Sequence, residues 1–325
     1  MVTQLIQENE DVLKRFVGFI RHQRLAHAYL FIGPQGIGKG QTALAVAKLI
    51  NCEDQDARQA GRYCGRCSTC LRVDSGNHPD VSVISSGEEN TIKISVIRDV
   101  ISRLQLRPYE ARVKVFIIEK IEELTLEGSN ALLKTLEEPA PNSLLLLTTD
   151  ILEKNLGTIR SRCHAVYFFA KHHRRLAQDM EPSSGLDPAA CRFLAAYAQG
   201  YPGRAQYFLK TGLVDRKNDW VNRLVLKKND QAFLKKILAD RQQTRAMLDI
   251  LLTWFRDVLV LKSGAAQQDL IHGDRVQDLQ RMAGRYTRAQ IEEIIREIVQ
   301  NARLLGENLN IKIAMQILME KIWLR

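Results

Sequence analysis

The chain has 325 residues, of which 45% are hydrophobic and 26% are charged, and its formal net charge is +10. This length predicts two or three domains, and this composition is typical of a globular chain and excludes a disordered one. No apolar run approaches the roughly 20 residues that cross a bilayer, and the polar N-terminus does not resemble a secretory signal. We therefore expect a cytoplasmic protein with no membrane partner. Its positive charge suits a polyanion such as nucleic acid, or serves solubility alone.

The first half of the chain alternates helical patterns with short apolar runs. The spacing of apolar residues predicts helices at 12–20, 39–50, 94–106 and 129–136. Apolar runs predict strands at 28–32, 80–84, 113–118, 144–148 and 165–169. Because these strands are mostly apolar, we expect a parallel sheet that helices cover on both faces.

Strand patterns end near residue 170, and the remaining patterns are helical. We therefore expect three parts: an α/β domain at 1–170, a small helical domain at 171–213 and an all-α domain at 214–325. The last two domains carry no repeat and no low-complexity tract.

A glycine-rich segment, Gly33-Pro-Gln-Gly-Ile-Gly-Lys39, follows the first predicted strand and opens a helix, which is the setting of a phosphate-binding loop. Its glycines let backbone N–H groups turn toward phosphate, and the helix N-terminus adds positive potential. The nucleotide-binding candidates are Gly33, Gly36, Gly38, Lys39, Gly40 and Gln41. Gly40 stands where a Ser or Thr would bind Mg²⁺. A glycine-rich turn that binds no ligand remains an alternative.

The predicted strand 113–118 ends in Glu119-Lys120. A P-loop enzyme that hydrolyses ATP needs an Asp for Mg²⁺ in this region of a following strand. Glu119 is one methylene longer than Asp, and Lys120 cannot orient water as a carboxylate does. Two independent catalytic positions therefore depart from the pattern, and we expect that ATP or ADP, if bound, is not turned over.

Four of the six cysteines cluster between residues 52 and 70: Cys52, Cys64, Cys67 and Cys70. Three cysteines at two-residue spacing with a fourth upstream form the ligand set of a tetrahedral Zn²⁺ site. A shell of four thiolates leaves no open position, so the predicted role of zinc is structural. An iron–sulfur cluster or free thiols are the alternatives.

Two further segments resemble a known family. Asn130-Ala-Leu-Leu-Lys-Thr-Leu-Glu-Glu-Pro139 and Thr158-Ile-Arg-Ser-Arg-Cys163 resemble the AAA+ clamp-loader family of replication. Residues 24–34 and 78–80 are similar, more narrowly, to the delta-prime subunits of bacterial DNA polymerase III. The resemblance covers residues 20–170. It implies an AAA+ domain with a zinc module, a helical lid and a C-terminal collar. It also implies a pentameric ring with gamma/tau and delta subunits, which places a sliding clamp on primed DNA.

The resemblance also implies roles for single residues. Arg162 matches the arginine finger that reaches the ATP site of a neighbouring subunit and stabilises charge on the γ-phosphate. Thr148, or its neighbour Thr149, matches the first sensor of the nucleotide, and Arg204 the second. The alternatives are a local salt bridge for Arg162 and structural remnants for the sensors.

Two other functions stay open at this point. An active ATPase of the gamma/tau type is one, although Gly40 and Lys120 argue against it. A zinc-bearing nucleic-acid-binding protein with a vestigial P-loop is the other, and it leaves the Ser161-Arg162-Cys163 motif unexplained. We expect the chain to have no intrinsic ATPase activity.

Overall fold

The structure is a computed structural model, and it describes residues 9–87, 90–151, 157–226, 230–264, 266–307 and 311–323. The chain divides into two compact units. The first comprises Met1–Lys171 and Tyr201–Arg204, and the second comprises His172–Gly200 and Ala205–Arg325. The predicted helical domains 171–213 and 214–325 fall almost wholly in the second unit, so their separation remains a prediction.

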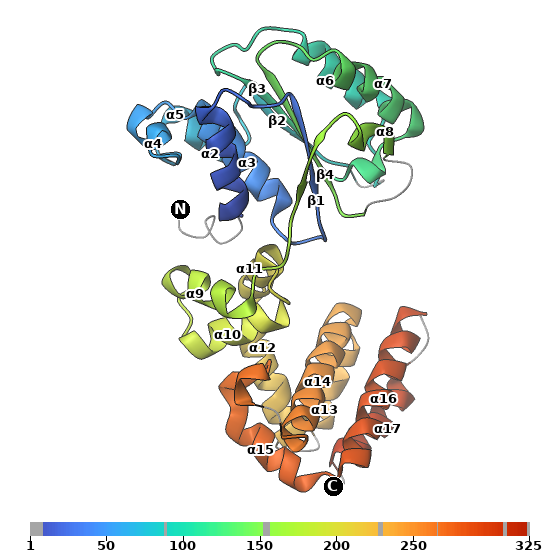
Figure 1. The fold of residues 1–325 in the computed structure, drawn as a ribbon. Helices are drawn as coiled ribbons and strands as arrows, with labels where there is room; N and C mark the ends of the chain where they lie inside the picture. Colours follow the sequence, from blue (N-terminus) through green and yellow to red (C-terminus); the bar gives the residue numbers. More distant parts are fainter. Residues whose placement is uncertain are drawn as a thin grey trace. The chain divides into compact units, whose positions relative to one another are not determined.

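The first unit is built on a five-stranded parallel sheet with the strand order β2-β3-β4-β1-β5 (Figure 1). Its strands are β1 (Ala28–Ile32), β2 (Val81–Ile84), β3 (Lys114–Ile118), β4 (Ser143–Thr149) and β5 (His164–Tyr167). Every residue of β1 and β3 is buried, as continuous apolar strands require. The predicted α/β class with a parallel sheet is confirmed.

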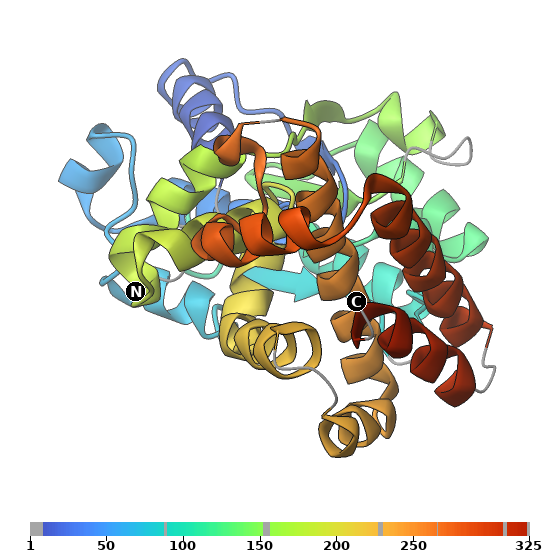
Figure 2. The same cartoon turned by 90° about the horizontal axis from the view of Figure 1, so that it is seen from below.

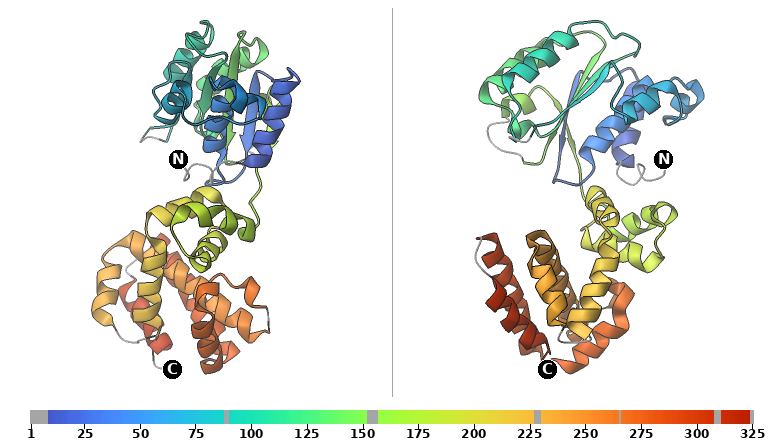
Figure 3. Two further views of the ribbon diagram at one scale, coloured as in Figure 1. Left: turned by 90° about the vertical axis from the view of Figure 1, so that its left-hand side faces the viewer. Right: turned by 180° about the vertical axis from the view of Figure 1, so that it is seen from behind.

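Helices cover both faces of this sheet (Figure 3). One face carries α2 (Glu10–Arg21), α3 (Lys39–Asn51) and α5 (Ser68–Asp74), and the other carries α6 (Ile94–Leu104), α7 (Leu126–Glu137) and α8 (Gly157–Arg160). Alternate residues of β1 enter the two cores. Phe31 packs with Phe16 of α2 on one face, and Leu30 lies with Leu132 of α7 on the other. A short helix α4 (Gln55–Gln59) and a 3₁₀ turn (Ile121–Glu123) complete the unit.

The predicted start of the helix at residue 129 is wrong, since α7 begins at Leu126. Thr125 caps its N-terminus by accepting a hydrogen bond from the N–H of Gly128 at 3.1 Å. A glycine weakens a helical pattern. Here a Cβ at position 128 would lie 3.1 Å from the Thr125 hydroxyl oxygen, so the small residue makes room for the cap.

The second unit is helical. It contains α9 (His173–Ser184), α10 (Pro188–Tyr197), most of α11 (Pro202–Lys210), α12 (Leu213–Trp220), a π-helical segment (Val221–Leu226), α13 (Gln231–Leu238), α14 (Arg241–Lys262), two 3₁₀ turns (Gln267–Asp269 and Gly273–Arg275), α15 (Val276–Arg285), α16 (Arg288–Gly306) and α17 (Lys312–Trp323). The long helix α14 packs against α15 and α16, and α16 and α17 lie side by side (Figure 2). Within the described residues, no helix is both long and apolar enough to cross a membrane.

Candidate nucleotide site and cysteine cluster

The glycine-rich loop lies at the carboxyl edge of the sheet, between β1 and α3. Because parallel strands end at the same edge, the residues after β3 and β4 meet there too, which is where α/β proteins bind ligands. Gly36 and Gly38 adopt φ angles of 82° and 97°, a left-handed conformation that favours glycine. At these two positions the loop therefore has the conformation for which glycine is suited.

Lys39 is the loop's only lysine and is 7% exposed. Its Nζ donates to the carbonyl oxygens of Gly33 at 2.6 Å and Pro34 at 3.2 Å, and to Oδ1 of Asp150 at 2.6 Å. The sequence predicts that this ammonium contacts the terminal phosphates of a nucleotide. In the structure it forms an ion pair with a carboxylate that follows β4.

Gly40 lies directly against Glu119, the residue that follows β3. A Cβ at position 40 would collide with Oε1 of Glu119. Burial raises the pKa of Glu119, although the positive charges of Lys120 and Lys39 oppose this shift. The hydroxyl of Thr42 donates to the carbonyl of Gly38 at 2.7 Å and so is turned into the helix. Neither position therefore presents a hydroxyl to the loop.

The remaining candidates near the loop have partners within the chain. Gln41 is half-buried in the first turn of α3. Thr148 accepts a hydrogen bond from the backbone N–H of Lys120 at 3.0 Å. Arg204 packs beside the loop, since a Cβ on Gly36 would lie 2.9 Å from its Cγ. The structure thus brings Arg204 to the loop and holds Thr148 to the backbone, and both sensor roles stay predictions.

Arg162 follows α8 and forms a local ion pair with Glu137, the last residue of α7. Its Nε donates to Oε1 of Glu137 at 2.7 Å, and its Nη1 donates to the carbonyl oxygen of Thr158 at 3.0 Å. The side chain remains 33% exposed. The local salt bridge is therefore present in this chain, and the arginine finger remains a prediction about an assembly.

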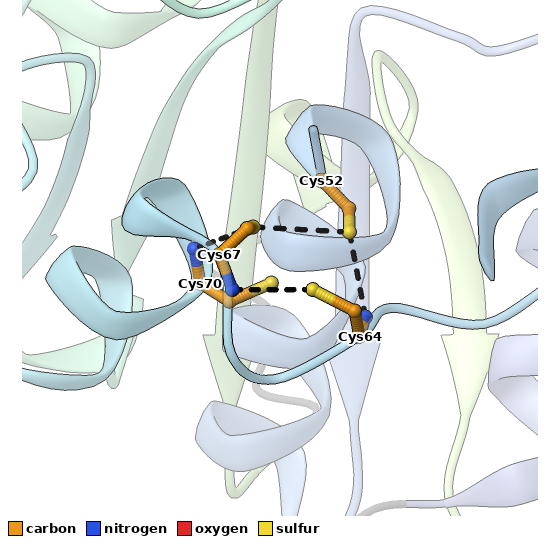
Figure 4. Close-up of side chains that lie close together, drawn as sticks. All are labelled: Cys52, Cys64, Cys67 and Cys70. Carbon is orange, nitrogen blue, oxygen red and sulfur yellow. Dashed lines mark hydrogen bonds between the residues drawn. The ribbon is translucent and has the colours of Figure 1, made fainter. Parts of the chain in front are cut away.

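The four clustered cysteines converge from three places (Figure 4). Cys52 is the C-cap of α3, Cys67 caps the N-terminus of α5, Cys70 lies within α5, and Cys64 lies in the loop that leads to α5. Their sulfur atoms all lie within 4.8 Å of one another. Residues on either side of α4 are thereby held together around one point.

This cluster fits a tetrahedral metal ion. Metal–sulfur bonds of about 2.3 Å place sulfurs about 3.8 Å apart, and the Sγ atoms of Cys52 and Cys67 are 4.0 Å apart. Backbone N–H groups of the same segment donate to the sulfurs of Cys52, Cys64 and Cys67. Burial opposes ionisation of Cys64, but N–H donors from Arg66 and Cys67 outweigh it and lower the pKa of this thiol to about 7. The donor set and its spacing fit a closed metal site.

Comparison with protein families decides where the chain belongs. A family model described as "DNA polymerase III, delta subunit" matches residues 8–172, and one described as "DNA polymerase III, delta subunit, C terminal" matches residues 216–323. The chain belongs to this family. The two models together cover both the α/β unit and the C-terminal helices of the chain.

Two of the relatives are delta-prime subunits. The delta-prime subunit of Bacillus subtilis (strain 168) DNA polymerase III is 26% identical over 93% of this chain and 92% of its own length. The delta-prime subunit of Pseudomonas aeruginosa is 37% identical over 42% of each chain. The tau subunit of B. subtilis is 34% identical, but the match spans 49% of this chain and 27% of tau. The match to the B. subtilis delta-prime subunit thus extends over most of the chain, whereas the match to tau covers about half of it.

A solved structure also matches over most of the length. The B. subtilis DNA clamp loader delta protein is 11% identical, and the match covers 96% of this chain and 100% of the other with a TM-score of 0.40.

The sequence interpretation missed one residue of the site. Asp150 follows β4, where the sequence interpretation considered only Thr148 and Thr149. The signal was an acidic residue directly after a buried strand, at the edge where the phosphate loop also ends. Its partner Lys39 lies 111 residues away in sequence, and a pattern of local spacing does not reveal such a contact.

Proposed function

We propose that this delta-family chain acts in a bacterial clamp loader as a subunit that does not hydrolyse ATP, and that it supplies Arg162 to the ATP site of a neighbouring subunit. The observation that carries the first part is the contact between Gly40 and Glu119. A hydrolysing site holds Mg²⁺ through a hydroxyl at the first of these positions. Here that hydroxyl is missing, and a carboxylate lies where its side chain would begin.

An active ATPase of the gamma/tau type fits these contacts less well. It would require Lys39 to leave Asp150, and Mg²⁺ to bind without a hydroxyl at position 40. Position 120, the second catalytic position, carries a lysine and therefore no carboxylate, and its ammonium pairs with Glu123 at 3.0 Å. The match to the B. subtilis tau subunit covers only 49% of this chain.

The arginine finger role is supported by exposure and position. Arg162 lies at the end of the segment Thr158–Cys163 and keeps a third of its surface accessible. Its ion pair with Glu137 is partly exposed, and exposed ion pairs contribute only about 0–1 kcal/mol. A phosphate on a neighbouring subunit can therefore replace Glu137 as its partner at little cost.

We further propose that the cysteine cluster binds Zn²⁺ in a structural role. Zinc favours tetrahedral thiolate sites, and four cysteine ligands leave no position for a substrate. Cys52, Cys64, Cys67 and Cys70 would hold the ion, which would fix the segment between α3 and α5 to the α/β unit.

The assembly follows the family. We propose a pentameric ring with gamma/tau and delta subunits, in which the helical domain 214–325 forms the collar and 171–213 the lid. The ring would place a sliding clamp on primed DNA in the cytoplasm, and ATP or ADP binding to this chain would occur without hydrolysis.

Steady-state ATP hydrolysis tests the proposal in two steps. Phosphate release is first measured for the purified chain with Mg²⁺, ATP and primed DNA, beside a Lys39→Ala variant. We expect the wild-type chain to release no more phosphate than the Lys39→Ala variant. Turnover that depends on Lys39 would refute the non-hydrolysing role and favour the gamma/tau alternative.

The second step measures the complex reconstituted with gamma/tau and delta subunits. Arg162→Ala removes the finger, and Arg160→Ala, on the same short segment, is the matched control because that arginine is also exposed. Arginine fingers contribute about 10³–10⁵ in rate in GTPases. We expect Arg162→Ala to remove one site's share of the turnover and Arg160→Ala to leave it intact. Equal rates for the two variants would refute the finger.

A further inference from the structure

Two carboxylates lie against the phosphate loop, one after β3 and one after β4. Asp150 accepts a hydrogen bond from Nζ of Lys39 at 2.6 Å, and Glu119 lies where a side chain at position 40 would begin. A P-loop binds phosphate through its lysine and metal through the hydroxyl that follows it. Side chains of this chain therefore take both places.

The partners of Lys39 match its capacity as a donor. An ammonium has three N–H groups. Three acceptors lie within hydrogen-bonding distance of Nζ, two loop carbonyls and the carboxylate of Asp150. The lysine side chain is buried, and that of Asp150 is 20% exposed. An incoming phosphate would therefore have to displace a charge-assisted bond that the surrounding chain partly shields from water.

Asp150 is itself held in position. Its backbone N–H donates to Oε1 of Glu122 at 2.9 Å, and Glu122 lies in the 3₁₀ turn that follows β3. This bond fixes the end of β4 and brings a further acidic side chain to the same edge. The carboxylate that pairs with Lys39 is thus part of an ordered contact between two strand ends.

We propose that Glu119 and Asp150, here called the acidic pair, act as an intramolecular substitute for a nucleotide in the phosphate loop. Asp150 sets the affinity for a nucleoside di- or triphosphate by competing for Lys39. Glu119 removes the Mg²⁺ dependence of that binding by filling the space beside Gly40. This rests on the proposed function insofar as residues 33–39 form a phosphate loop that does not turn over ATP.

Calorimetric titration of the full chain with ADP tests the role of Asp150. Asp150→Asn removes the charge while keeping the size, and Asp150→Ser is a second variant in case the first does not fold. Glu123→Gln is the matched control, because that carboxylate lies at the same edge but pairs with Lys120. A hydrogen bond to a charged group contributes about 1.5–3 kcal/mol, which corresponds to about ten- to a hundredfold in affinity. We expect a gain of this size in either Asp150 variant and none in Glu123→Gln. An affinity equal to that of the control would overturn the proposal for Asp150.

The role of Glu119 is tested by rebuilding the metal ligand. In Gly40→Ser alone the new side chain meets the carboxylate of Glu119, which has to move aside. Gly40→Ser combined with Glu119→Asp shortens the carboxylate, and we expect ADP to bind this double variant more tightly with Mg²⁺ than without it. Magnesium is omitted rather than chelated, so that the cysteine cluster is not disturbed. An equal response to Mg²⁺ in the double variant and the wild type would overturn the role of Glu119.

These results separate the inference from the proposed function. Phosphate release is recorded for every variant that gains affinity. Turnover by the wild-type chain would refute the non-hydrolysing role, yet the change in ADP affinity on replacing Asp150 could still be measured. Unchanged affinity would overturn the acidic pair and leave the absence of turnover and the role of Arg162 as they stand.

Discussion

Asp80 is the residue whose replacement we expect to damage the α/β unit most directly. It immediately precedes β2, is 2% exposed, and accepts three backbone hydrogen bonds. The donors are the N–H groups of Tyr109 at 2.9 Å, Glu110 at 2.8 Å and Ala111 at 2.9 Å. These residues belong to the segment that leads from α6 into β3. One buried carboxylate thus fixes the entry to a central strand.

The expected cost follows from these bonds. Each hydrogen bond to a charged group contributes about 1.5–3 kcal/mol. The three bonds share one carboxylate, and the freed N–H groups lie in a largely exposed segment where water can replace it. We therefore expect Asp80→Ala to lower the free energy of unfolding by about 3–5 kcal/mol rather than by the full sum. At about 2–4 °C per kcal/mol for a unit of this size, the melting temperature should fall by about 10 °C. Asp99→Asn is the matched control on α6, because Asp99 is 65% exposed and lies 3.7 Å from Arg103.

Differential scanning calorimetry measures the melting temperatures of both variants and of the wild type.

The dependence of this difference on pH adds a second check. Burial opposes ionisation of Asp80, but its three N–H donors and Lys114 hold its pKa below the usual value. A depressed carboxyl pKa stabilises the folded state above the unfolded pKa of about 3.9, and this contribution is lost as the pH falls through the folded pKa. The difference between wild type and Asp80→Ala should therefore be full at pH 7 and shrink below about pH 4. A loss below 1 kcal/mol at pH 7, or a difference that does not depend on pH, would refute this reasoning.

Three further predictions concern the metal and the second unit. Cys70→Ala should abolish the binding of one zinc per chain, measured by atomic absorption, and lower the melting temperature of the α/β unit. Burial and nearby cations hold the pKa of His272 well below its usual value, so stability should fall as the pH drops below about 6.5, and His272→Gln should flatten this dependence in urea unfolding. Lys217→Met leaves the carboxylate of its partner Asp274 unpaired and should cost about 3–5 kcal/mol, and adding Asp274→Asn should recover most of this loss.

The sequence predicted those features that depend on local patterns. The strand at 28–32 matches β1 residue for residue, because a strand buried on both faces has to be apolar throughout. The cysteine cluster was found because its ligands are separated by two or eleven residues. Contacts between distant segments, such as those of Asp80 with residues 109–111 and Asp150 with Lys39, were not found, since no local pattern marks them.

The relation between Gly40 and Glu119 also differs from the sequence interpretation, which treats them as two independent departures from a hydrolysing site. In the structure they touch, since Oε1 of Glu119 lies in the space that a Cβ at position 40 would need. A Ser or Thr at position 40 therefore requires the carboxylate of Glu119 to move, either by rotating away or by being shortened to Asp. We expect that neither substitution alone rebuilds a metal site. Gly40→Ser alone leaves the longer carboxylate of Glu119 beside the new hydroxyl, and Glu119→Asp alone leaves the metal without a hydroxyl at position 40. The two departures are thus in direct contact, and we expect that either substitution alone leaves the chain without ATP turnover.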